Sequence, residues 1–206
     1  MIRLPNIRLC AVVITMVVLL FSCRKEEQIV PSTSTTVTGG ESGEICGFFL
    51  QNEGNMGSNK STLERNPGVV KELGDVGNDI QIYGNKLYAV VNCSHFVEVM
   101  DVRTARHITQ ISIPNCRYIV FKGRYAYVSS YAGPVQSDPN ARLGYVAKVD
   151  TVTMSVVGTC TVGYQPEEMV ISGNKLYVAN SGGYRVPNYD RTVSVIDLDT
   201  FREVKK

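Results

Sequence analysis

The chain of 206 residues carries 21 basic and 19 acidic side chains, so its formal net charge is only +2. It is 44% hydrophobic and can bury a core, but it has no Lys/Arg stripe, and nucleic acid is therefore not an expected partner. With two histidines and no Cys-x-x-Cys pair, the sequence predicts neither a metal site nor a cofactor.

Residues 1–22 have the pattern of a lipoprotein signal peptide. The apolar run over residues 9–21 is shorter than the roughly 20 residues that a membrane-spanning helix needs. Ser22 stands directly before Cys23, as in a bacterial lipobox, so Cys23 is the expected site of lipid attachment. The alternative is an ordinary cleaved signal with an incidental cysteine.

Residues 23–44 are expected to form a lipidated, flexible tether. Residues 31–44 are rich in Gly, Ser and Thr and cannot bury a core. The acidic pair at residues 26–27 resembles the surface-export signal of some Gram-negative lipoproteins. We therefore expect a lipid-anchored outer-membrane protein on the cell surface, with the periplasmic face as the alternative.

One sequence motif recurs three times in the remaining chain, at residues 84–90, 123–128 and 173–178. Each copy begins with Gly and continues as an apolar alternation, and a second alternation ending in Asp follows it. Repeats of roughly 40 to 50 residues built from short strands are typical of propellers, in which each unit buries its faces against its neighbours.

Each repeat predicts the four antiparallel strands of a propeller blade, joined by tight Gly-Asn and Asp-Thr turns. Residues 47–52 align with residues 87–92, so we expect them to be the second strand of a blade whose first strand is missing. The expected strands cover residues 47–52, 61–64, 69–73, 79–82, 86–92, 96–101, 107–113, 117–121, 124–130, 145–150, 155–162, 168–171, 176–180 and 192–197, with a last one from residue 201.

These strands predict an all-β fold, a β-propeller of which residues 45–206 supply about 3.75 four-stranded blades. Since nothing here supplies the missing first strand, we expect the N-terminal part of a larger ring. The alternative is a complete four-bladed ring.

Several motifs carry a family resemblance. Residues 162–167, 173–180 and 192–200 resemble YncE-type propellers, and residues 50–57 and 116–119 are similar to lipid-anchored members with seven blades. That group includes surface lipoproteins that bind cobalamin. The resemblance covers residues 46–206. It implies a seven-bladed, lipid-anchored propeller that captures a nutrient such as cobalamin, or docks on an outer-membrane transporter.

Length variation is concentrated on one rim of the expected blades, where residues 130–143 and 181–191 are insertions. Variable loops on a rigid scaffold usually carry binding residues. The polar and aromatic candidates for ligand binding are Asn52, Glu53, Asn55, Asn92, His95, Arg117, Tyr131, Tyr184, Arg185, Asn188 and Tyr189. In the competing interpretation, the asparagines cap loop backbones and Arg117 pairs with a neighbouring blade.

The sequence favours a binding protein over an enzyme. It shows no His/carboxylate cluster, and Glu167 and Glu168 are adjacent on a strand, so their side chains point to opposite faces. One alternative is a structural protein that makes protein–protein contacts in a surface assembly. The other is a propeller hydrolase or oxidoreductase with catalytic groups in missing blades.

Four cysteines remain after the expected signal peptide and lipid attachment site: Cys46, Cys93, Cys116 and Cys160. Their scattered spacing favours buried free thiols, with one disulfide as the alternative.

Overall fold

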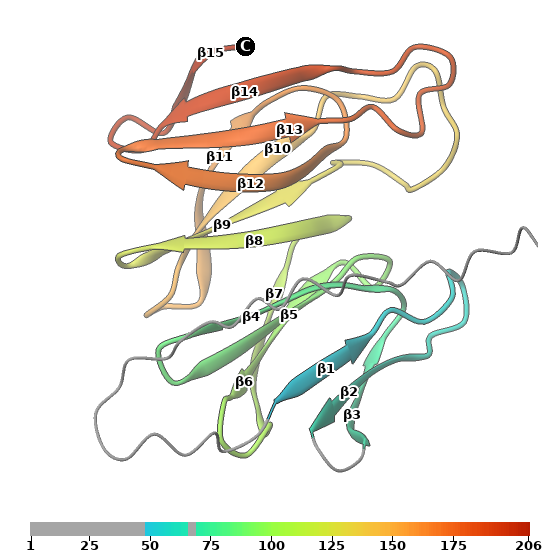
Figure 1. The fold of residues 1–206 in the computed structure, drawn as a ribbon, viewed down its shortest axis with the longest axis vertical. Helices are drawn as coiled ribbons and strands as arrows, with labels where there is room; N and C mark the ends of the chain where they lie inside the picture. The colour runs from blue at the N-terminus through green and yellow to red at the C-terminus, as the bar shows by residue number, and fades with distance from the viewer. Residues whose placement is uncertain (1–47, 66–68) are drawn as a thin grey trace, which may run out of the picture. The chain divides into compact units, whose positions relative to one another are not determined.

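The computed structural model describes residues 48–65 and 69–206, which belong to one compact unit. Every regular element in these residues is a β-strand, and the strands form four separate antiparallel sheets (Figure 1). No helix that could cross a membrane occurs in these two ranges. The expected signal peptide, Cys23 and the whole of the expected tether, residues 23–44, lie outside the described residues, as does Cys46.

In each sheet the strands are hydrogen-bonded to one another in chain order. The first sheet contains β1 (Phe49–Asn52), β2 (Ser61–Arg65) and β3 (Val69–Gly74). The second contains β4 (Gly77–Tyr83), β5 (Lys86–Val91), β6 (Phe96–Asp101) and β7 (His107–Ser112). The third contains β8 (Cys116–Lys122), β9 (Tyr125–Ser130), β10 (Tyr145–Asp150) and β11 (Ser155–Thr161). The fourth contains β12 (Pro166–Ser172), β13 (Lys175–Asn180), β14 (Thr192–Asp197) and β15 (Arg202–Lys205). These are three complete propeller blades and one three-stranded blade, which confirms the predicted fold class.

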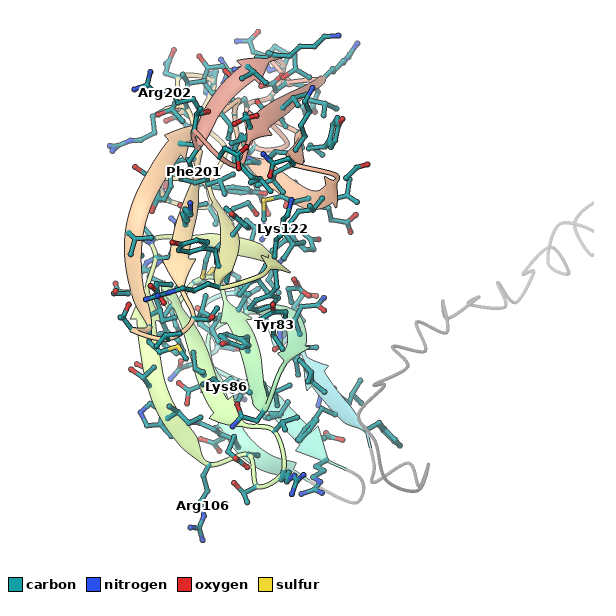
Figure 2. The ribbon with its side chains drawn as sticks, turned by 90° about the vertical axis from the view of Figure 1, so that its left-hand side faces the viewer. Tyr83, Lys86, Arg106, Lys122, Phe201 and Arg202 are labelled. Carbon is teal, nitrogen blue, oxygen red and sulfur yellow. The ribbon has the colours of Figure 1, made fainter. Side chains whose placement is uncertain are left out.

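Tight hairpins join the first and second strands of each complete blade. Gly84, Gly123 and Gly173 have φ angles of 61°, 56° and 56°, a region that glycine enters without steric cost. Successive blades contact each other at these turns, because Tyr83 Oη donates to the carbonyl of Gly123 at 2.6 Å and Lys122 Nζ to that of Gly173 at 2.5 Å. Tyr83 and Lys122 are labelled in Figure 2, on the rim of the tight turns.

Apolar faces of successive blades pack against each other and form the core. Tyr88 of the second sheet packs with Ile119 of the third, and Tyr127 of the third packs with Leu176 of the fourth. Tyr88 and Tyr127 are therefore only 1% and 2% exposed. Tyr177 occupies the same position in the fourth blade and is half-buried.

The face of the fourth sheet that carries Tyr177 is uncovered within the described residues. Val170 pairs with Tyr177 across the strands and is 61% exposed, and Val193 is 48% exposed. The equivalent face of each preceding blade is covered by the next blade, so this sheet presents an apolar face of the kind that blades bury.

The predicted alignment of residues 47–52 with residues 87–92 is wrong by one position. It puts Phe48 at the position of Tyr88, but Phe49 is the residue that packs against the second sheet, while Phe48 and Leu50 are 60% and 48% exposed. Because side chains alternate along a strand, a slip of one residue exchanges its two faces.

Three cysteines lie within the described residues, and Cys93, Cys116 and Cys160 are all free thiols. Cys116 is fully buried, and this burial raises the pKa of its thiol to about 12. It therefore behaves as a small apolar core residue.

Candidate ligand-binding site

Long loops and first strands meet on the rim opposite the tight turns. Here we name β4, β8 and β12, the first strands of the three complete blades, the channel strands, because in a propeller the first strands border the central channel. The long loops between β9 and β10 and between β13 and β14 lie side by side in Figure 1. Both therefore project from the rim where the channel strands begin.

The two loops are held together by hydrogen bonds and by Arg185. The backbone N–H of Asp138 donates to the carbonyl of Tyr184 at 2.8 Å, so each loop supports the other. Arg185 donates to the carbonyls of Asn188 in its own loop, at 2.8 Å, and Pro139 in the other, at 3.2 Å. Its guanidinium lies 3.6 Å from the ring centroid of Tyr164. Arg185 therefore organises the loops, a role that sequence alone did not assign to it.

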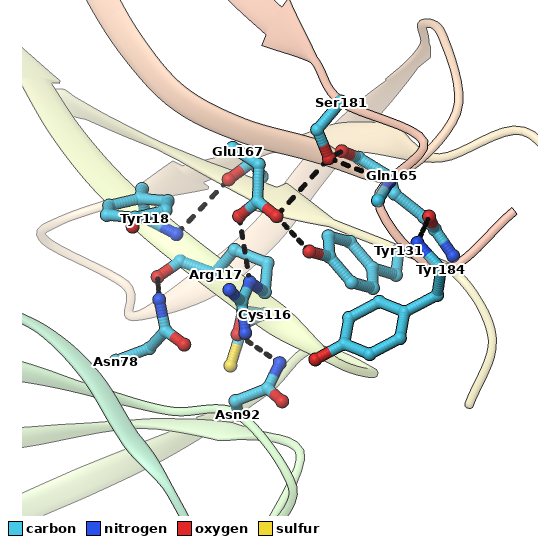
Figure 3. Close-up of polar contacts among 12 residues, drawn as sticks. Asn78, Asn92, Cys116, Arg117, Tyr118, Tyr131, Gln165, Glu167, Ser181 and Tyr184 are labelled. Atoms are coloured by element: carbon cyan, nitrogen blue, oxygen red, sulfur yellow. Dashed lines mark hydrogen bonds and ion pairs between the residues drawn. The ribbon is translucent and has the colours of Figure 1, made fainter. Parts of the chain in front are cut away.

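Glu167, on β12, is the centre of the polar network at this rim (Figure 3). Its Oε2 accepts a hydrogen bond from Arg117 Nε at 3.0 Å, and its Oε1 accepts one from the hydroxyl of Tyr131. Ser181 Oγ donates to the same Oε1 at 3.4 Å. The third and fourth blades are thus joined by a charged, partly buried cluster.

Aromatic rings line one side of this cluster. The guanidinium of Arg117 lies over the ring of Tyr131, 4.9 Å from its centroid, and Tyr184 meets Tyr131 edge-on with centroids 6.2 Å apart. Figure 3 shows Arg117, Tyr131 and Tyr184 gathered around Glu167. A cation on an aromatic face and an edge-on aromatic pair are both favourable arrangements.

The surroundings of these groups set their ionisation. Burial alone would lower the pKa of Arg117, but Tyr131 and Glu167 beside it outweigh this effect and raise the pKa above its ordinary value. Burial also raises the pKa of the Tyr131 hydroxyl far above its ordinary value. Near neutral pH, Arg117 is therefore a cation and Tyr131 a hydrogen-bond donor.

The same strand position supplies the blade-to-blade contacts in each repeat. Asn78, Arg117 and Glu167 each stand six residues before the glycine of the tight turn. Asn78 Nδ2 donates to the carbonyl of Arg117 at 3.0 Å, and Arg117 in turn reaches Glu167. This position therefore connects three successive channel strands.

Two hollows lie along the channel strands, and Arg117 of the cluster lines the larger one. The larger, of about 380 Å³, is lined by side chains that include Gln51, Glu53, Asp79 and Arg117. The smaller, of about 220 Å³, lies among all three channel strands, and Asp79 lines it too. Burial raises the pKa of Asp79, although the backbone N–H groups of Ile119 and Ile80 donate to its carboxyl group.

Four of the eleven predicted site residues lie in the cluster or line a hollow: Glu53, Arg117, Tyr131 and Tyr184. Part of the competing structural interpretation also applies here. Asn92 Nδ2 donates to the carbonyl of Cys116 at 2.9 Å, and Arg117 pairs with a neighbouring blade. Arg117 therefore holds the scaffold as well as bordering the site, whereas Asn92 lines neither of the two hollows and holds the scaffold.

The other candidates lie elsewhere or have evident structural partners. Asn52 Nδ2 donates to Thr62 at 2.9 Å and Glu64 at 2.7 Å within the first sheet. The Nδ1 of His95 accepts a hydrogen bond from the backbone N–H of Asn115 at 3.1 Å. Three candidates lie exposed in loops: Asn55, Asn188 and Tyr189.

Sequence reasoning did not select Glu167 or Asp79 as site residues. Both lie in strands, whereas the prediction favoured residues in variable loops. The available signal was the shared position of residues 78, 117 and 167, and that of residues 79, 118 and 168, relative to the turn glycines. In residues 48–65 and 69–206, no three His, Cys, Asp or Glu side chains are grouped so that they could hold a metal ion.

The comparisons with known proteins define the class by fold alone: the chain is a β-propeller protein. No family model matches its sequence, and no curated protein does. Hydrazine synthase of Kuenenia stuttgartiensis is 20% identical with a TM-score of 0.60, and the match covers 78% of this chain and 45% of that one. The WD40 β-propeller domain of Doa1 is 11% identical with a TM-score of 0.56, over 79% of this chain and 50% of that one.

A third similar structure is the dihydro-heme d1 dehydrogenase NirN, at 11% identity and a TM-score of 0.51, over 76% of this chain and 34% of that one. The chain thus spans half or less of the length of these three structures. At such identities they share its architecture, and their activities are not carried over.

Proposed function

We propose that this chain belongs to a lipid-anchored binding propeller of the bacterial cell envelope, which captures a nutrient of the cobalamin class and presents it to an outer-membrane transporter. One observation carries the proposal: the two longest loops of the described residues lie side by side (Figure 1), and the larger polar hollow is lined by residues near the start of β4 and β8, on the same rim. The lipobox at Cys23 and the resemblance to surface propeller lipoproteins support the location.

The dimensions of the site limit how such a ligand would bind. Pockets that enclose small ligands usually measure about 300–1,000 Å³. A corrinoid is larger than either hollow here, so it would lie across the rim and insert only a side group. The exposed aromatic ring of Tyr189 and the half-buried ring of Tyr184 would then contact its flat face.

Calorimetric titration of the full-length protein with cobalamin and cobinamide tests this proposal, with glycans and siderophores for comparison. We expect corrinoid binding that Tyr184→Ala or Tyr189→Ala weakens by about tenfold, since each removes an aromatic contact. Arg106→Ala, on the opposite rim, is the matched control and leaves binding unchanged. Absence of binding to every compound, with no transporter co-purifying, excludes nutrient capture.

A structural role in a surface assembly is the second candidate. It is favoured by the loop between β13 and β14, where Val186 is 49% and Tyr189 48% exposed. Tyr is enriched at protein interfaces. If this role is correct, cross-linking in intact membranes captures a protein partner, Tyr189→Ala reduces the yield, and titration detects no small molecule.

A further inference from the structure

One position in each complete blade contributes a side chain to the channel side. Asp79, Tyr118 and Glu168 each stand five residues before the glycine of the tight turn, on β4, β8 and β12. The strand β8 lies beside both β4 and β12, and these three side chains line the same hollow of about 220 Å³. The repeat therefore builds a wall of two carboxylates and one aromatic ring.

The two carboxylates lack a cationic partner within the described part of the chain. Neither Asp79 nor Glu168 forms an ion pair there, and no Lys, Arg or His lines this hollow. The Asp79 carboxylate is held in place by the N–H groups of Ile119, at 3.0 Å, and Ile80, at 2.8 Å. The negative charge of Glu168 adds to burial in raising the pKa of Asp79.

The larger hollow adjoins this wall and offers further hydrogen-bond acceptors. Asp79 and Tyr118 line both hollows, and Gln51 and Glu53 line only the larger one. Gln51 Oε1 is buried and has no hydrogen-bond partner among the described residues, an arrangement that costs free energy unless a donor arrives. Arg117 also lines this hollow, but Glu167 balances its charge.

We propose that the two hollows together bind an organic cation. Its ammonium group lies between Asp79 and Glu168 beside the ring of Tyr118, and an N–H or O–H group of the same ligand donates to Gln51 Oε1. Carboxylates and an aromatic face both attract a cation, and an ammonium group needs no set of metal ligands. This inference rests on the proposed function, because it names the charge class of the group that the binding propeller accepts.

The test is calorimetric titration of the full-length protein with ethanolamine, tetramethylammonium and tert-butanol. Tert-butanol is a neutral compound of nearly the same shape as tetramethylammonium. We expect both cations to bind and the alcohol not to bind. Asp79→Asn and Glu168→Gln each weaken cation binding by about tenfold, because each removes one of the two charges. Glu72→Gln, an exposed glutamate on β3, is the matched control and leaves binding unchanged.

Glu168 is exposed, so Glu168→Gln keeps the test valid if Asp79→Asn fails to fold. The proposal is overturned if tert-butanol binds as tightly as tetramethylammonium, or if Glu168→Gln binds cations like the unaltered protein. Corrinoid binding measured in parallel separates the two proposals. Corrinoid binding without cation binding refutes only this inference, and cation binding without corrinoid binding refutes only the corrinoid proposal.

Discussion

Glu167 shows how one side chain connects two blades and shapes a binding rim. Its two carboxylate oxygens accept hydrogen bonds from Arg117 and Tyr131, which both belong to the preceding blade. The side chains of Glu167 and Arg117 are 23% and 16% exposed, so water screens this ion pair less than it screens a surface pair. Loss of either Glu167 or Arg117 leaves the charge of the other partly buried without an opposite charge beside it.

Glu167→Gln is expected to lower the free energy of unfolding by about 1–3 kcal/mol, because it removes the charged acceptor of Arg117 and Tyr131. Urea denaturation followed by circular dichroism measures the change. Glu203→Gln is the matched control, since Glu203 pairs with Lys206 at 3.7 Å near the chain end, and we expect less than about 0.5 kcal/mol. Equal losses in the two variants would show that the Glu167 cluster is not structural.

Another carboxylate, that of Glu98, is fully buried and lies away from the proposed site. It is 1% exposed and pairs with Lys71 of the preceding blade, while His107 Nδ1 and Gln110 Nε2 lie 2.8 Å from its two oxygens. Burial would raise the pKa of Glu98, but the hydrogen bonds from these three side chains outweigh it and hold the pKa below its ordinary value.

The lowered pKa of Glu98 predicts a specific dependence of stability on pH. The stabilisation is fully present above the unfolded-state pKa of a glutamate, about 4.3, and is lost as pH falls through the lower folded-state value. The difference in unfolding free energy between the unaltered protein and Glu98→Gln should therefore shrink as the pH falls below about 4. Urea titrations across this range measure it, and a pH-independent difference would contradict the assignment.

At the scale of the element, the burial of the tyrosine that recurs in the second strand of each complete blade depends on whether another blade covers it. Tyr88 and Tyr127 are buried beneath the following blade, whereas Tyr177 is half-buried on an uncovered sheet face. Residue type and strand position are the same in all three, so the difference in burial comes from the neighbouring sheet.

Tyr127→Ala should therefore destabilise this chain by about 3–5 kcal/mol, as deletion of a buried aromatic ring does. Tyr177→Ala is the matched comparison and should cost less than about 1 kcal/mol, since its ring makes fewer contacts. Thermal and urea unfolding of the two variants measure both values. A cost for Tyr177→Ala as large as that for Tyr127→Ala would mean that its sheet face is covered in solution.

The sequence predicted the strands that are flanked by recognisable turns and have an alternating apolar pattern. The glycine turns and alternating strands of the three full repeats indicated all twelve of their strands, although β4 and β12 begin two residues earlier than expected. The alignment failed at β1, because the sequence before it does not contain the glycine motif that fixes the register in the three full repeats. An apolar run such as residues 48–50 does not by itself show which face is buried.

The candidate site was predictable only in part, because the sequence shows loop lengths but not the contacts between blades. The two insertions were recognised because loop length is visible in one sequence. Glu167 and Asp79 act through partners in other blades, and those contacts depend on how strands are brought together in space. Only the comparison of equivalent positions among repeats could have indicated them.

At the scale of the whole molecule, the proposed location depends on Cys23, which lies outside the described residues. Cys23→Ala removes the residue that would carry the acyl chains. The protein should therefore move from the membrane fraction to the soluble fraction, because the acyl chains supply the anchoring. Detergent partitioning and incorporation of labelled palmitate check this. Membrane association and labelling that persist in the variant would exclude Cys23 as the anchor.

The placement of Asp79, Tyr118 and Glu168 has a consequence for how such a protein could diversify. These side chains project from strands, while the groups available to a large partner sit on the rim loops. A single substitution at the middle blade, for example Tyr118→Lys, would neutralise one of the two negative charges of this wall, weaken its preference for cations and leave the rim loops intact. Under the proposed function, selectivity for the ligand and choice of docking partner would thus depend on different residues of one scaffold.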